Sequence, residues 1–160
     1  MQDSDTLSNN IDRYGSDNRE TKKLVVVLDT AAFLSGFQLL LHGLELITTP
    51  SVIKEVRDFE SVARLEIALS VDRVRVIMPS RMFIDKAITI AKDIGILHRL
   101  SPTDIEVIAL ALEYKGKGFK VLVATDDYAI QNIVSLENMD FLPIKTQGIS
   151  KPHKEKSKRR

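Results

Sequence analysis

The sequence predicts an α/β fold, a three-layer α/β/α sandwich around a mainly parallel central sheet of four to five strands. Two short apolar runs, 24–28 and 121–124, are rich in β-branched residues, and each is followed by helix-like sequence. Such runs are typical of parallel strands that are buried on both faces and lead into crossover helices. Strand-like and helix-like segments alternate throughout the rest of the core, as expected of a parallel sheet covered by helices.

The first half of the chain predicts three strands with helices between them. After the strand at 24–28, a short helix begins at Ala31 and should end near Gly36, and a second strand is expected at 44–48. Thr49 can cap the next helix, and Pro50 suits the first helical position, where no amide hydrogen is needed. The buried stripe expected for this helix is Val52, Ile53, Val56 and Phe59. A further helical stretch covers 62–69, and the alternation in 73–78 predicts a third strand nearer the edge of the sheet.

The second half predicts three helices and two strands. A helix is expected near 80–94, and Ser101 with Asp104 matches the start of a helix that is closed by a capping box. That helix should continue to the glycine-containing turn at 115–118. The fourth strand follows at 119–124, then a helix at 128–135 and a short last strand at 139–144.

Length and charge predict one domain with two polar ends. At 160 residues and 18.0 kDa the chain suits a single domain, which we place at 22–148 after an acidic and polar leader at 1–21. A basic tail at 149–160 carries six cationic side chains: Lys151, Lys154, Lys156, Lys158, Arg159 and Arg160. Such a tail can simply keep a protein in solution, but next to a carboxylate metal site it favours binding to RNA.

Composition excludes several kinds of site. The absence of cysteine rules out disulfides, thiolate zinc sites and a cysteine nucleophile. The three histidines, His42, His98 and His153, form no spaced metal motif, so oxygen ligands remain for any metal. No segment is apolar enough to cross a bilayer, and the polar, acidic start is unlike a secretory signal, so we expect a cytoplasmic protein.

Four acidic residues stand where they could face one cleft. Asp29 and Asp126 follow the two buried strands, and the carboxyl ends of parallel strands meet at one edge of the sheet. Glu55 and Asp104 lie at the flanks of apolar helical stripes. Each acid also has a simpler interpretation, because Asp29 and Asp126 could cap helices, Asp104 could complete a capping box and Glu55 could be solvated.

Charge repulsion favours a shared cation over four independent roles. Two carboxylates about 4 Å apart repel by about 4 kcal/mol at the effective dielectric near a protein surface. The sequence immediately around Asp29, Asp104 and Asp126 supplies no lysine or arginine. Mg²⁺ or Mn²⁺ is therefore the expected neutraliser, since both prefer oxygen ligands.

The segments that carry these acids resemble the four acidic blocks of the PIN-domain ribonucleases. The blocks are 27–33 around Asp29, 50–56 around Glu55, 100–111 around Asp104 and 123–128 around Asp126, in the family's order over about 24–144. The 100–105 and 125–132 stretches are most similar to the ribosome-assembly group, which matures the 3′ end of small-subunit ribosomal RNA. The chain differs from that group because it lacks the cysteines of the zinc ribbon that usually follows the domain.

The resemblance implies metal-dependent hydrolysis of RNA phosphodiesters that leaves a 5′-phosphate and a 3′-hydroxyl. By position, Asp29, Glu55, Asp104 and Asp126 match the catalytic and metal-binding acids, with Asp127 as an additional candidate ligand. Thr125 and Thr30 match the hydroxyl residues that orient the site. Pre-ribosomal RNA is the implied partner, and a homodimer remains open.

Other functions remain as alternatives. A toxin-type PIN ribonuclease controlled by an antitoxin would keep the same fold and chemistry, and a non-catalytic PIN scaffold would keep the acids only as helix caps. An aspartyl-nucleophile phosphatase needs a second acid two residues after the first, where Ala31 stands. A phosphorylated receiver domain would cluster its acids differently along the chain.

Overall fold

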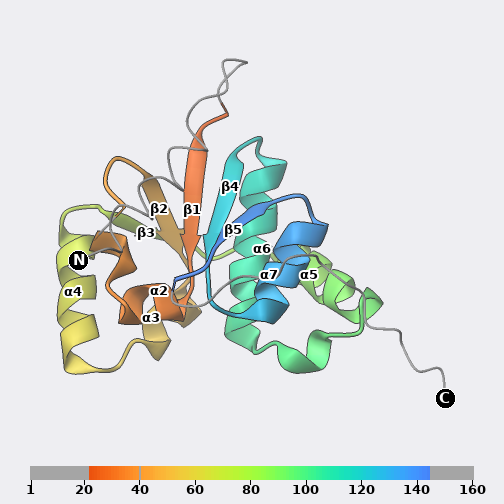
Figure 1. Ribbon diagram of the computed structural model, residues 1–160, viewed down its shortest axis with the longest axis horizontal. Coiled ribbons are helices and arrows are strands. Elements are labelled where there is room, and N and C mark those ends of the chain that lie inside the picture. Colours follow the sequence, from red (N-terminus) through yellow and green to blue (C-terminus); the bar gives the residue numbers. More distant parts are fainter. Residues whose placement is uncertain (1–21, 40, 145–160) are drawn as a thin grey trace.

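Five parallel strands form one sheet in the order β3-β2-β1-β4-β5 (Figure 1). The computed structural model describes residues 22–39 and 41–144. The strands are β1 (Leu24–Leu28), β2 (Glu45–Thr48), β3 (Val74–Val76), β4 (Lys120–Ala124) and β5 (Asp140–Leu142). Every neighbouring pair of these strands is parallel, which confirms the predicted α/β class.

In the part of the chain that the structure describes, six α-helices cover the sheet. They are α2 (Thr30–Leu34), α3 (Pro50–Glu55), α4 (Phe59–Ser70), α5 (Arg81–Asp93), α6 (Pro102–Gly116) and α7 (Tyr128–Leu136), with short 3₁₀ turns η1 (Phe37–Leu39) and η2 (Leu97–Arg99). Helix α2 contacts α3 and α4, while α6 contacts α5 and α7. Helices α2, α3 and α4 connect β1, β2 and β3, whereas α5, α6 and α7 connect β3, β4 and β5, and the two groups cover the sheet (Figure 1).

The two central strands are buried on both faces. Val25, Val26 and Val27 of β1 are fully buried, and helix α6 packs against both β1 and β4. This explains why each strand is an uninterrupted apolar run and not an alternating one. The register pairs Leu28 with Ala124, so both strands end at the same level of the sheet.

The expectation of one helix with a buried stripe from Val52 to Phe59 is wrong. Helix α3 ends at Glu55, and α4 begins only at Phe59. Asp58 starts the second helix, because its Oδ1 accepts a hydrogen bond from the Ser61 amide at 2.9 Å. The ends of the other elements differ from prediction by up to two residues.

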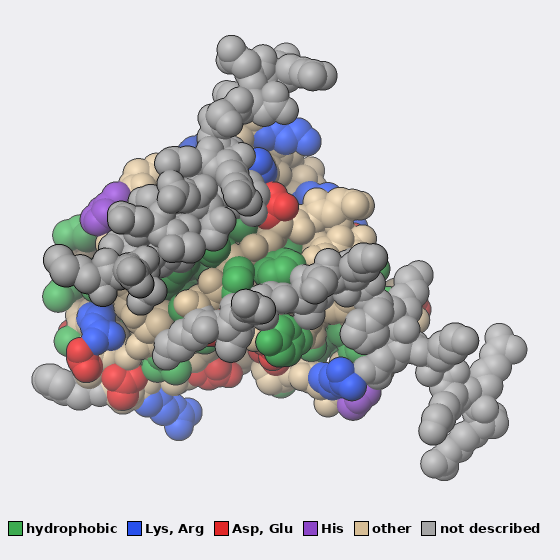
Figure 2. Space-filling model, in the orientation of Figure 1, with side chains coloured by type: hydrophobic (Ala, Val, Ile, Leu, Met, Phe, Trp, Pro, Cys, Tyr) green, Lys and Arg blue, Asp and Glu red, His purple; other side chains and the backbone are tan. Residues whose placement is uncertain are grey.

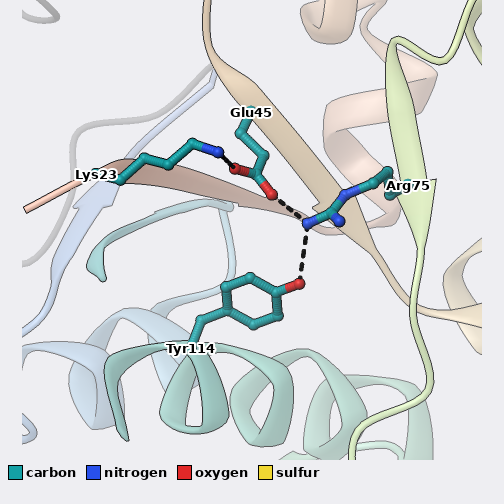
Figure 3. Close-up of polar contacts among 4 residues, drawn as sticks. All are labelled: Lys23, Glu45, Arg75 and Tyr114. Carbon is teal, nitrogen blue, oxygen red and sulfur yellow. Dashed lines mark hydrogen bonds and ion pairs between the residues drawn. The ribbon is translucent and has the colours of Figure 1, made fainter. Parts of the chain in front are cut away.

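A polar network ties the opposite, amino edge of the sheet together (Figure 3). Glu45 at the start of β2 pairs with Lys23 at 2.8 Å and with Arg75 of β3. Arg75 also donates to the Tyr114 hydroxyl of α6 at 3.1 Å. These ion pairs thus lie at the amino ends of the strands, and the predicted acids lie at the carboxyl ends.

The predicted leader at 1–21, the end of the predicted domain beyond 144 and the basic tail at 149–160 lie outside the described residues. Within 22–39 and 41–144, no helix has the length and hydropathy needed to cross a membrane.

Candidate active site

The site lies where the strand order reverses. Strand β1 pairs with β2 on one side and with β4 on the other, so the segments that follow β1 and β4 diverge around a crevice. In open parallel sheets this position binds ligands. Asp29 follows β1 directly, and Thr125, Asp126 and Asp127 follow β4.

A cavity of about 300 Å³ opens at this edge, and we call it the acidic cavity. It is lined by Asp29, Thr30, Ala31, Leu34, Glu55, Thr103, Asp104, Val107 and Asp127. Among the described residues, the lining contains four carboxylates and no lysine or arginine. Figure 2 shows acidic side chains, with some basic ones among them, along the lower rim of the molecule, the direction in which the strand arrows of Figure 1 point.

Asp126 lies next to the acidic cavity and not in its lining. It lines a neighbouring hollow of about 380 Å³, and Asp127 borders both spaces. The Asp126 Oδ1 accepts a hydrogen bond from the Ile144 amide at 2.7 Å, just after β5. The structure therefore brings Asp29, Glu55, Asp104 and Asp127 to one cavity and places Asp126 at its border.

Local hydrogen bonds hold each carboxylate of the cavity. Asp29 caps α2 by accepting from the Ala32 amide at 3.0 Å, and Asp127 caps α7 by accepting from the Ala129 amide at 2.7 Å. Asp104 completes the predicted capping box, accepting from the Ser101 amide at 2.7 Å. Glu55 accepts from the Thr30 hydroxyl at 2.6 Å. The simpler interpretation of Asp126 as a helix cap is wrong, because Asp127 occupies that position.

Thr125 connects two of these acids. Its side chain is fully buried and hydrogen-bonds to the Asp29 carboxyl. Its Oγ1 also accepts from the Asp127 amide at 3.0 Å, and its carbonyl accepts from the Gln131 side chain at 2.9 Å. Thr125 thus fixes the end of β4 relative to the end of β1.

Burial makes ionisation of the cavity unfavourable. It raises the pKa of Asp29 to about 6, against the lowering effect of the Thr125 and Ala32 hydrogen bonds and with added repulsion from Asp126 and Asp104. Burial also raises the pKa of Asp104, and the neighbouring Asp127 and Glu55 add to that effect. Among the described residues of the cavity lining, no lysine or arginine would offset a negative charge on Asp29 or Asp104.

The donor chemistry fits a hard divalent cation, but the spacing is not that of a formed metal site. Carboxylate oxygens are the ligands that Mg²⁺ and Mn²⁺ prefer. Among the described residues, no three Asp, Glu or His side chains are close enough as they stand to hold one ion. Binding would therefore require some of these side chains to turn toward the ion.

Sequence reasoning did not single out three residues of the neighbouring hollow: Arg99, Tyr128 and Asn132. Tyr128 directly follows Asp126 and Asp127, and Arg99 stands two residues before the Ser101 cap. Proximity to the acidic blocks was the available signal. The six cationic residues predicted to bind RNA all lie outside the described part of the chain.

A solved structure supports the fold. The chain is similar to a chain in the crystal structure of VapBC2 from Rickettsia felis bound to a DNA fragment from the promoter, with a TM-score of 0.53 and 14% sequence identity. The match covers 74% of this chain and 98% of that one.

Sequence relatives and a family model identify the class of protein. Ribonuclease VapC3 of Aeropyrum pernix is 39% identical, covering 80% of this chain and 91% of the relative. Endoribonuclease Nob1 of Methanothermobacter thermautotrophicus is 42% identical over 77% of this chain and 70% of the relative, and Nob1 of Pyrococcus abyssi is 36% identical over 81% and 73%. The model described as "PIN domain of ribonuclease" matches residues 26–114. Enzymes of this family generally use divalent metal ions, and the chain belongs to the PIN-domain ribonucleases.

Proposed function

We propose that the protein hydrolyses RNA phosphodiesters in the acidic cavity as a Mg²⁺- or Mn²⁺-dependent endoribonuclease that matures the 3′ end of small-subunit ribosomal RNA. One observation carries the catalytic part of this proposal. Segments far apart in the sequence bring four carboxylates into a single cavity, and no cationic side chain of the described part of the chain lines it. Such an arrangement is costly without a bound cation.

The acidic residues of the site would bind the metal ion, and two threonines would position them. Asp29, Glu55 and Asp104 would hold the ion from the lining of the cavity and Asp126 from its border, with Asp127 of the lining as a further ligand. When bound, the ion would polarise a phosphoryl oxygen and lower the pKa of a water molecule. Thr125 would keep Asp29 in place through the hydrogen bond described above, and Thr30 would do the same for Glu55.

The non-catalytic scaffold is the weaker alternative, although Asp29, Asp104 and Asp127 do serve helix ends. Asparagine or serine caps a helix about as well as aspartate, without introducing a charge. If Asp29 served only to cap α2, a buried carboxylate with a raised pKa would therefore not be required there. Metal binding requires a negatively charged side chain, whereas helix capping does not.

Two biological roles compete within the catalytic proposal. The ribosomal role is supported by Nob1 relatives from several archaea and by a 36% identical stretch in the yeast relative named 20S-pre-rRNA D-site endonuclease, which covers 44% of this chain. The toxin role is supported by the VapC relatives and the VapBC2 structure. We rank the ribosomal role first, with cytoplasmic pre-ribosomal RNA as the substrate and the basic tail as an additional RNA contact.

An activity assay tests the site. The purified chain should cleave RNA with Mn²⁺ and leave 5′-phosphate and 3′-hydroxyl ends, and Asp29→Asn and Asp126→Asn should each abolish cleavage. Asp58→Asn is the matched control, because Asp58 also caps a helix but lies outside both cavities. If both aspartate variants cleave like the wild type, the proposed site is wrong.

Two further measurements separate the alternatives. Titration calorimetry with Mn²⁺ should give heat in the wild type that is lost in both aspartate variants, whereas a scaffold would give none. Mapping RNA ends after incubation with pre-ribosomal and unrelated transcripts tests the ribosomal role. Copurification with a small antitoxin would instead favour the toxin role.

A further inference from the structure

The hollow beside the acidic cavity combines side chains that suit a nucleotide. It is lined by Ile96, Arg99, Asp126, Asp127, Tyr128, Ala129 and Asn132, and we call it the Tyr128 hollow. Its volume of about 380 Å³ is in the range of small-ligand sites. The Tyr128 side chain is 53% exposed, so much of its aromatic ring is open to solvent at this hollow.

The backbone on both sides of the hollow is well anchored. Arg99 ends the turn η2, and its amide donates to the Ile96 carbonyl at 2.9 Å. Ile96 is only 1% exposed, so the turn is fixed in the core. Tyr128 begins α7 directly after the Asp127 cap, and Asn132 lies one helical turn later on the same side.

The exposed side chains of the lining, Arg99 and Tyr128, suit single-stranded RNA. An exposed aromatic ring offers a surface on which a base can stack, and a guanidinium binds phosphate. Asn132 is only 4% exposed and forms part of the wall of the hollow. Because Asp127 lines both spaces, the Tyr128 hollow and the acidic cavity are next to each other.

We propose that the Tyr128 hollow binds one nucleotide of single-stranded RNA next to the bond that is cleaved, with Tyr128 stacking on the base and Arg99 contacting a phosphate. This inference rests on the proposed ribonuclease function and adds the element that holds the strand. It also makes the enzyme selective for unpaired RNA, since a base within a duplex is not available for stacking on a side chain.

Binding measurements without metal test the subsite apart from cleavage. Fluorescence anisotropy with a short labelled single-stranded RNA in EDTA should show that Tyr128→Ala weakens binding about tenfold, while Tyr128→Phe keeps the affinity within about twofold. Arg99→Ala should reduce the slope of log affinity against log salt by about one, and Arg99→Lys should retain it. Arg81→Ala is the matched control, because Arg81 is an exposed arginine at the start of α5 that lines neither cavity.

An RNA with one abasic nucleotide gives a sharper test of stacking. When the abasic nucleotide flanks the cleaved bond, the difference between wild type and Tyr128→Ala should disappear. A duplex of the same sequence should bind both proteins equally. Circular dichroism and thermal unfolding would establish that the variants are folded.

The outcomes distinguish this inference from the proposed function. If the wild type cleaves RNA with Mn²⁺ but Tyr128→Ala keeps the same Kd and KM, the subsite is wrong and the function stands. If binding depends on Tyr128 while no metal supports cleavage, the subsite stands and the proposed function fails. Equal sensitivity of duplex and single-stranded RNA to Tyr128→Ala would overturn the stacking role.

Discussion

Replacing Asp29 by asparagine should stabilise the metal-free protein at neutral pH. Burial raises the pKa of Asp29 from 3.8 to about 6, so the folded state binds a proton more tightly than the unfolded state does. The free energy of unfolding should therefore fall as pH rises from about 4 to about 6, and the loss should be complete above that window. Asparagine cannot ionise, and its side-chain oxygen can still accept the Ala32 hydrogen bond that caps α2.

The size of the effect follows from the pKa. A shift of about two units at about 1.4 kcal/mol each gives about 3 kcal/mol of destabilisation by ionised Asp29. For a protein of this length, that difference corresponds to a rise of about 6–12 °C in Tm for Asp29→Asn. At pH 3 both proteins should have about the same stability, because Asp29 is then protonated in both states.

Urea unfolding across a pH series measures this difference, and Asp58→Asn provides a control of opposite sign. Asp58 also caps a helix, but it is exposed, and hydrogen bonds from the Ser61 amide and hydroxyl hold its pKa below the usual value. Neutralising Asp58 should therefore lower stability slightly above about pH 4 and never raise it. If Asp29→Asn is no more stable than wild type at neutral pH, or if its gain persists at pH 3, the electrostatic reasoning fails.

Three other changes test how the site is held. Thr125→Val should lower the free energy of unfolding in urea by about 1–3 kcal/mol and slow cleavage, because the Asp127 amide loses its buried acceptor. Thr125→Ser should retain most of the stability and most of the activity. A fully active valine variant would contradict the positioning role. Thr30→Val should weaken Mn²⁺ binding by about 10–100-fold in calorimetry, since Glu55 loses its orienting hydrogen bond. An unchanged Kd for Mn²⁺ would show that Glu55 does not need this hydrogen bond. Deleting 150–160 should weaken RNA binding and make its salt dependence shallower in anisotropy titrations; if neither changes, the tail only aids solubility.

The sheet was predictable because its central strands are buried on both faces. The run of valines in β1 allows little besides a strand between two helical layers, and the register that joins β1 to β4 follows once both strands are recognised. The break between α3 and α4 was harder, because Val52 and Val56 are both buried and continue the helical spacing across it. The decisive feature is the Asp58 cap, which periodicity does not reveal.

The acidic cavity was predictable in composition but not in detail. Topology brings the residues after β1 and β4 together, so the convergence of Asp29 with the 125–127 segment follows from the strand order. Which of the two neighbouring aspartates caps α7 depends on the residue at which the helix begins, and the sequence alone does not decide it. Arg99 could not be assigned because it comes from a turn whose position depends on tertiary packing of Ile96.

The hydrogen bond between the Ile144 amide and Asp126 places the start of the C-terminal segment beside the site. Residues 145–160 are outside the described part, but sixteen residues span at most about 55 Å even when fully extended. Under the proposed function, the cationic residues at 151–160 would contact the RNA and not the cavity. Under the proposed function this separation of charge is useful, because carboxylates repel phosphates and the cavity contributes little attraction of its own. The tail would supply affinity for RNA while the cavity supplies the ion, which is how a chain with a net charge of only +1 can bind a polyanion.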